Sequence, residues 1–352
     1  MTAVDELAEG VVAALEAFER ARRDYFPGIV PRLREAFAPV IDRLKESITA
    51  HRSLSADPAG GIGKTLLDAA DLCCEALRLS VEADWMEQSL VDFRKAGRRI
   101  CRVQERLYPL CPVLPPINRF FLEEKVRDRA ETFIRDNGTT SSTAGIVHLG
   151  LDDDPYARGG LSLYIPEYDD GTRPLPLVVA LHGGFGHGRD FLWTWLREAR
   201  SRCFIVAAPS SRGPTWTITG HDFDALLLQE VLETLCRGWN IDRKRILITG
   251  LSDGGTYALV RVMDEDPPFS AYAVVSGILP PFDLRHVKGR RIYWVHGAKD
   301  WMFPVWRAKT GEKELATAGA DVTLKIVPDL YHAYPREQND GILAWFDPAL
   351  AL

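Results

Sequence analysis

The 352-residue sequence predicts an all-helical amino-terminal region followed by an α/β domain with a mostly parallel sheet. Two observations predict this division. In the first third of the chain, apolar residues recur at spacings of three and four, as one face of a helix requires. From residue 145 onward, short β-branched runs are separated by helical segments, which is the pattern of strands covered by helices. We place the two regions at residues 1–137 and 138–352.

Four helical stretches are expected in the amino-terminal region. They cover residues 4–25, 29–51, 66–107 and 118–134. The first two repeat apolar residues at helical spacing, and the third is rich in Ala, Leu, Glu and Arg, which are strong helix formers. Between the last two, the proline-rich segment 108–118 is expected to be extended, because proline removes a backbone donor and fixes φ.

Eight strands are expected in the second region. They are residues 145–150, 160–166, 175–183, 203–209, 245–252, 271–277, 291–297 and 322–328. Residues 177–181 are apolar throughout, and 245–249 are apolar between Arg245 and Thr249, rather than alternating. This suits a parallel sheet buried on both faces. An amphipathic helix is expected at residues 223–239. The region is therefore predicted to be an α/β fold.

The composition of the chain argues against several classes of function. The net charge of −6 argues against binding to nucleic acid or to an anionic membrane, because a protein needs a basic surface to bind either of them. No apolar run is long enough to span a bilayer, and the amino terminus is acidic where a signal peptide would be basic, so a cytoplasmic location is expected. The six cysteines lack CxxC or zinc-finger spacing and are expected to be buried thiols, without a metal or an organic cofactor.

A glycine-rich run, GGIGKT at residues 60–65, resembles a phosphate-binding loop. Such a loop needs an apolar strand before it and a helix after it. The preceding residues are polar, and Pro58 occupies the position where the pattern requires its first glycine. We therefore expect a turn between two helices, with Lys64 and Thr65 opening the second, and we keep a nucleotide switch as a remote alternative.

A second motif has the context that its chemistry requires. Residues 250–254 read G-x-S-x-G, with an apolar strand before them and a helix-forming segment after them. This strand-turn-helix arrangement is typical of a nucleophile elbow, which exposes a serine hydroxyl on a sharp turn. Ser252 is therefore the candidate nucleophile.

A serine nucleophile needs a base to take its proton and an acid to orient that base. Asp300 and His332 each follow the end of a predicted strand, in the chain order Ser, Asp, His, and open α/β sheets place their sites at such ends. Asp300 is the candidate acid and His332 the candidate base. Asp329, three residues before the histidine, is the competing acid.

Further candidates surround this serine. Acyl transfer needs two N–H donors for the oxyanion, and we expect them from Asp253 and from the HGG turn, at Gly184 or alternatively Phe185. His182 is expected to organise that turn by hydrogen bonding. Trp216 and Trp301 are the candidate walls of the substrate-binding pocket.

Taken together, LHGGFGHG, GLSDGG, HGAKDWMFP and YHAYP resemble the α/β-hydrolase superfamily, in particular its phospholipase/carboxylesterase and dienelactone-hydrolase-like esterases. The resemblance covers about 200 residues. It implies a serine esterase that forms an acyl-enzyme on Ser252, with a small-molecule ester as substrate. Asp253 departs from the pattern, since related esterases often carry Gln, Asn or Met there, and its charge beside an oxyanion hole is unhelpful unless it is turned away or paired.

Several alternatives stay open. The same residues would serve a thioesterase, a small-peptide hydrolase or a dienelactone-type hydrolase, and a non-catalytic binding protein could keep the fold. The helical region is not part of the usual compact esterase. We expect it to be an appendage, a lid over the ester pocket or the surface of a homodimer.

Overall fold

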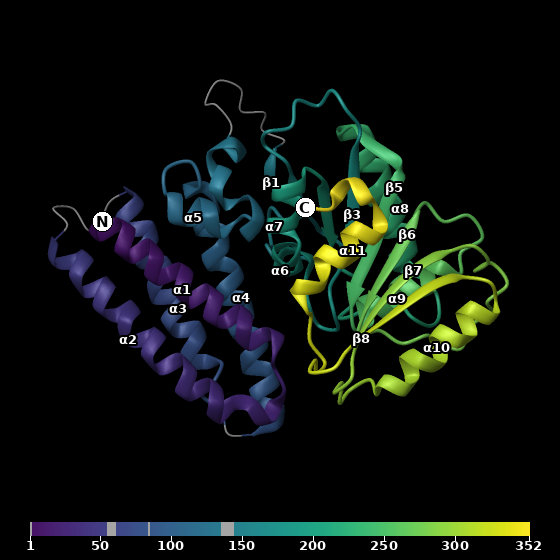
Figure 1. The fold of residues 1–352 in the computed structure, drawn as a ribbon, viewed down its shortest axis with the longest axis horizontal. Coiled ribbons are helices and arrows are strands. Elements are labelled where there is room, and N and C mark those ends of the chain that lie inside the picture. Colours follow the sequence, from purple (N-terminus) through teal and green to yellow (C-terminus); the bar gives the residue numbers. More distant parts are fainter. Residues whose placement is uncertain (1, 55–60, 84, 135–143) are drawn as a thin grey trace. The chain divides into compact units, whose positions relative to one another are not determined.

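The computed structural model describes residues 2–54, 61–83, 85–134 and 144–352, and the chain divides into two compact units, Met1–Arg135 and Asp136–Leu352. The first unit contains only helices among its described residues, and the second is built on a single sheet (Figure 1). The boundary expected at residue 137 lies outside the described residues. The expected order of a helical region followed by an α/β region is confirmed.

The first unit is formed by α1 (Ala3–Arg23), α2 (Val30–Leu54), α3 (Gly61–Leu79), α4 (Met86–Leu107) and α5 (Pro115–Phe120). Helix α1 starts with a capping box, in which the Thr2 hydroxyl accepts from the Asp5 N–H and the Asp5 carboxylate accepts from the Thr2 N–H. Its buried face carries the apolar residues at the spacing of three and four that the sequence shows. Stacked aromatic rings of Phe18, Tyr25 and Phe93 join α1 to α4.

Two local predictions for this unit were wrong. The helix expected over residues 66–107 is two helices, because α3 ends at Leu79 and the extended Trp85 precedes α4. The segment 108–118 is not extended: Tyr108–Leu110 form a 3₁₀ turn, and Pro115 opens α5. Proline at the first helical position costs no hydrogen bond, since the N–H it lacks would have no partner there. The stretch expected at 118–134 is the end of α5 and a kinked 3₁₀ helix, Glu124–Phe133.

The second unit holds an eight-stranded sheet of order β1-β2-β4-β3-β5-β6-β7-β8 (Figure 1). The strands are β1 (Gly145–Leu149), β2 (Leu161–Ile165), β3 (Leu175–Leu181), β4 (Ile205–Pro209), β5 (Ile241–Leu251), β6 (Ala271–Val275), β7 (Arg291–Gly297) and β8 (Asp321–Val327). The pairings β1–β2 and β2–β4 are antiparallel, and all the others are parallel. Each strand lies where the sequence predicts one.

The central strands are buried on both faces, which explains their unbroken apolar sequences. In β3, Leu177 and Val179 belong to the core that also contains residues of α8 (Phe223–Gly238), α9 (Asp253–Val262) and α10 (Val305–Thr317), whereas the fully buried Val178 lies outside that core. Because side chains alternate along a strand, Val178 faces the opposite side of the sheet. The elements on that side include α7 (Leu196–Arg202) and α11 (Asn339–Phe346), which are joined by an ion pair.

Candidate active site

The G-x-S-x-G motif forms a sharp turn from β5 into α9. Ser252 has φ 55° and ψ −117°, a conformation that residues with a side chain rarely adopt. Its N–H donates to the Val275 carbonyl at 2.8 Å, which holds the turn against β6. A side chain at Gly254 would collide with the carbonyl oxygens of Leu181 and His182, so only glycine lets α9 start this close to β3.

Three predicted residues form one hydrogen-bonded chain. His332 Nε2 lies 2.9 Å from Ser252 Oγ, and His332 Nδ1 lies 2.8 Å from Asp300 Oδ2. A carboxylate only accepts, so Nδ1 carries the proton; in a neutral imidazole Nε2 then accepts from the serine hydroxyl. The arrangement can pass the serine proton to the imidazole and stabilise the resulting cation with the carboxylate.

The ends of parallel strands explain why these residues meet. Ser252 follows β5, Asp300 follows β7 and His332 follows β8, and the register pairs Gly297 at the end of β7 with Val327 at the end of β8. The Asp300 side chain is fixed by two backbone donors, since Oδ1 accepts from the N–H groups of Met302 and Phe303 at 3.0 and 2.7 Å. This leaves Oδ2 for the histidine.

A second histidine packs behind Asp300. His296 is fully buried at the end of β7, and its Nε2–H donates to the Phe303 carbonyl at 2.8 Å. Burial lowers the pKa of His296, although the Asp300 carboxylate opposes this shift. A neutral His296 leaves the negative charge of Asp300 to pair with His332.

The HGG turn after β3 brings Gly184 to the serine side of the sheet. Gly183 lies against Ser252, because a Cβ on this glycine would be 3.6 Å from the serine Cβ. The Phe185 N–H donates to the Pro214 carbonyl at 2.8 Å, so this donor is already engaged and the structure does not support Phe185 as an oxyanion donor. Gly184 and Asp253, the first residue of α9, are the remaining candidates.

His182, which is expected to organise the HGG turn by hydrogen bonding, and Trp216, a candidate wall residue, are both buried. His182 is 1% exposed; its Nδ1–H donates to the Gly183 carbonyl at 2.7 Å, and its Nε2 accepts from the Ser211 N–H at 3.1 Å. Trp216 is 2% exposed and donates to the His182 carbonyl at 2.7 Å. Both therefore support the HGG turn from behind rather than line a pocket. Trp301, next to Asp300, is 42% exposed and stays a candidate wall residue.

GGIGKT does not form a phosphate-binding loop in its described part. Residues 58–60 lie outside the described residues, and Gly61 to Thr65 are the first turns of α3. The Lys64 ammonium forms an ion pair with Asp68 one turn later, at 2.6 Å. The charge of Lys64 is therefore paired with a carboxylate of its own helix.

Comparison with known proteins supports the resemblance drawn from the motifs. Residues 221–344 match the phospholipase/carboxylesterase family of α/β-hydrolases. The second unit has the α/β-hydrolase fold. The expected resemblance is thereby confirmed, together with the helical region that precedes the fold, and the match supports a carboxylic ester hydrolase.

Individual relatives are distant. A bifunctional acetylxylan esterase/xylanase of Neocallimastix patriciarum is 29% identical over 135 residues, covering 36% of this chain and 19% of that protein. A probable inactive carboxylesterase of Oryza sativa subsp. japonica is 26% identical over 111 residues, covering 30% of this chain and 45% of that protein. A thermostable esterase of known structure is 24% identical, with a TM-score of 0.46, over 53% of this chain and 58% of its own. The chain thus spans less than half the length of the two curated relatives.

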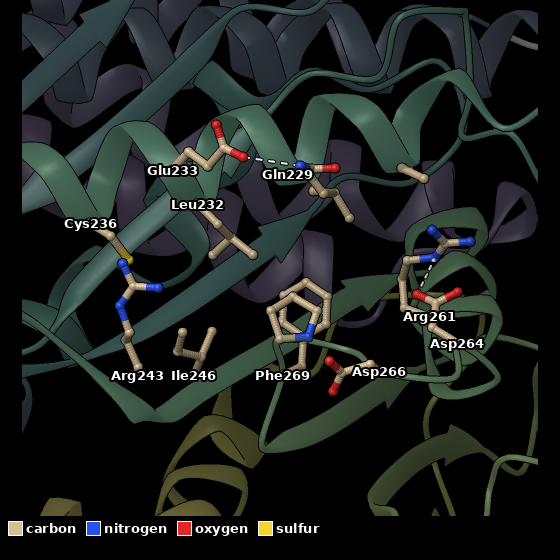
Figure 2. Close-up of a pocket in the computed structure, with 13 residues that line it drawn as sticks. Gln229, Leu232, Glu233, Cys236, Arg243, Ile246, Arg261, Asp264, Asp266 and Phe269 are labelled. Atoms are coloured by element: carbon tan, nitrogen blue, oxygen red, sulfur yellow. Dashed lines mark hydrogen bonds and ion pairs between the residues drawn. The ribbon is translucent and has the colours of Figure 1, made fainter.

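A cavity of about 560 Å³ in the α/β-hydrolase unit lies apart from these residues (Figure 2). It is lined by residues of α8 and by Ile246 and Phe269. These two residues lie just before Leu247 and Ala271, where the pairing of β5 with β6 begins. Figure 2 shows Arg261 beside Asp264 and Gln229 bonded to Glu233 at its edges. The serine site lies at the other ends of the strands.

Two kinds of feature are absent from the described residues. No described helix is long and apolar enough to cross a membrane. Within the same residues, no group of three or more His, Cys, Asp and Glu side chains is arranged to hold a metal ion.

Sequence reasoning missed Thr215. Its hydroxyl donates to Asp253 Oδ2 at 2.6 Å. It was missed because the segment after β4 carries no sequence motif. The signal that could have found it is topological: β4 runs parallel to β3, so residues that follow its carboxyl end lie at the same edge as the HGG turn. Phe303 was also missed, and its ring makes a T-shaped contact with the His332 ring.

The buried His182 predicts a pH dependence of stability. Burial lowers its pKa to about 3, from 6.5 in the unfolded chain. Between these values the unfolded chain binds a proton that the folded protein does not, so the free energy of unfolding falls as pH drops below 6.5. Over pH 6.5 to 5 this contribution is roughly 2 kcal/mol.

In the variant His182→Gln, urea unfolding between pH 6.5 and 5 should therefore show a smaller loss of stability than in the wild type, even if the variant is less stable throughout. The control substitution is His221→Gln, at an exposed histidine. Equal losses in the wild type and His182→Gln would contradict the prediction.

Proposed function

We propose that the protein hydrolyses carboxylic esters through an acyl-enzyme, with Ser252 as nucleophile, His332 as base and Asp300 as acid. The observation that carries this proposal is the hydrogen-bonded chain from Ser252 Oγ through His332 to Asp300, on a turn with positive φ. The match of residues 221–344 to the phospholipase/carboxylesterase family supports the same reaction.

In the proposed reaction, the Ser252 oxygen attacks the ester carbonyl carbon while its proton moves to His332 Nε2. The N–H groups of Gly184 and Asp253 stabilise the oxyanion, and His332 then gives the proton to the departing alcohol. Water, deprotonated by His332, releases the acid from the acyl-serine. A fixed pair of donors stabilises the oxyanion without reorganisation, and each is worth about 10²–10³-fold in kcat.

The test uses the full-length protein, a fluorophosphonate probe and a panel of p-nitrophenyl esters of increasing acyl length. We expect labelling at Ser252 and turnover of at least the shorter esters. Acyl thioesters and small peptides in parallel reactions decide between an esterase and the thioesterase or peptidase alternatives. If nothing is labelled and nothing is turned over, the protein is a binding protein with a hydrolase fold and the proposal fails.

We also propose a cytoplasmic location and self-association through the helical unit. All six cysteines are free thiols, which suits a reducing compartment.

Trp85 and Met86, at the start of α4, are 79% and 65% exposed, and large apolar side chains at such positions are typical of contact surfaces. Sedimentation velocity of the full-length protein, with and without a Trp85→Ser and Met86→Ser double substitution, measures the association.

A further inference from the structure

The strongest feature that the proposed reaction does not use is the side chain of Asp253. Its Oδ2 accepts a hydrogen bond from Thr215 Oγ1 at 2.6 Å. The same oxygen would be 2.6 Å from a Cβ built on Gly184. The carboxylate therefore lies directly against Gly184, one of the two residues proposed to bind the oxyanion.

Among the described residues, no protein cation balances the negative charge of this carboxylate. Within the described parts of the chain, Asp253 forms no ion pair with a lysine, an arginine or a histidine, and its hydrogen-bond donor, Thr215, is neutral. The start of α9 makes the charge tolerable in the free protein, because the partial positive charge of a helix amino terminus favours an acid in the first turn.

An unbalanced carboxylate beside an oxyanion hole opposes catalysis of a neutral ester. The oxyanion carries the same sign, and like charges at this range repel strongly in a partly buried site. A positively charged group on the substrate removes this conflict, because it pairs with the carboxylate while the oxyanion forms. Asp253 is also only half-buried, so a substrate group can approach it.

We propose that Asp253 makes the enzyme selective for esters that carry a positive charge next to the ester group. This inference rests on the proposed function and names its substrate class. Thr215 is a positioning residue in this scheme, because its hydroxyl holds the carboxylate against Gly184. The charge can belong to the acyl part, as in an α-amino ester, or to the alcohol part, as in a quaternary ammonium alcohol.

The test compares esters that differ in charge but hardly in shape. For the acyl side the pair is alanine ethyl ester and ethyl isobutyrate; for the alcohol side it is acetylcholine and 3,3-dimethylbutyl acetate. Hydrolysis is followed in a pH-stat at pH 6.5, where an α-amino group is mostly protonated. The measured quantity is the ratio of kcat/KM for the cationic ester to kcat/KM for its neutral partner.

In the wild type we expect a ratio of about ten or more for at least one pair, since one charge contact in a partly buried site is worth about a factor of ten or more. Asp253→Asn keeps an acceptor for Thr215 and removes the charge, so it should lower that ratio by about tenfold or more. The matched control is Asp266→Asn, which removes an exposed charge at the cavity of Figure 2 and should leave the ratio as in the wild type.

Thr215→Val, which removes the hydroxyl but keeps the shape, should give a ratio between those of the wild type and Asp253→Asn. Wild-type ratios of one or below for both pairs overturn the inference even if the Asp253 variant does not fold. A high ratio that survives Asp253→Asn also overturns it. In both cases ester hydrolysis and Ser252 labelling persist, so the proposed function stands; loss of both activities in the wild type would instead refute the function itself.

Discussion

Ser252→Ala should abolish fluorophosphonate labelling and lower kcat for every hydrolysed ester by about 10⁴-fold or more, because the attacking oxygen is lost while binding and the oxyanion donors persist. Alanine is the appropriate replacement. The Ser252 side chain makes its contact to His332 only through Oγ, and the backbone turn is held by the Val275 carbonyl and the Thr256 N–H. The variant should therefore fold like the wild type.

The control for this prediction is the thermal midpoint of unfolding, which should change little in Ser252→Ala. The positive φ of Ser252 is equally strained with alanine. If the variant keeps most of the esterase activity at an unchanged midpoint, another residue is the nucleophile. The residual rate should be independent of a second substitution at His332, since residues that act as one unit are not additive.

Asp300→Asn should lower kcat by about 10⁴-fold, with little change in stability. The turn explains the size of the effect. Backbone N–H groups of Met302 and Phe303 hold Oδ1, so an asparagine keeps its oxygen there and presents its Nδ2 donor to His332. The imidazole must then carry its proton on Nε2, where it can no longer accept from Ser252.

The matched control is Asp329→Asn, which removes the same charge from an exposed position three residues before His332. We expect this variant to keep its kcat within about twofold, as surface substitutions usually do. A loss of activity in Asp329→Asn, with Asp300→Asn active, would reassign the acid. Steady-state kinetics on one p-nitrophenyl ester are sufficient for both variants.

The strands and the elbow could be predicted because their signals are local. An unbroken apolar run such as 177–181 identifies a strand buried on both faces, and G-x-S-x-G between a strand and a helix identifies the turn. Chain order and position after strands then sufficed to select Asp300 and His332. In the structure, His332 contacts both Ser252 and Asp300, so the three residues form one hydrogen-bonded chain.

The rest depended on packing that no local pattern encodes. Trp216 follows a strand end like a pocket residue, but its indole N–H pairs with the His182 carbonyl in the interior. Proline at 115 starts a helix although prolines around it suggest an extended chain. The contact of Thr215 with Asp253 joins residues 38 apart in sequence, so neither position indicates it alone.

The distribution of the three residues along the chain also has a consequence for folding. Ser252 and His332 are 80 residues apart, and they come together only when β5, β6, β7 and β8 have paired in register. Such non-local pairing is slow, because the entropy of closing long loops is lost before the contacts form. The proposed esterase activity would therefore be among the last properties to return on refolding, well after the local helices of the first unit, and no fragment that ends before β8 could possess it.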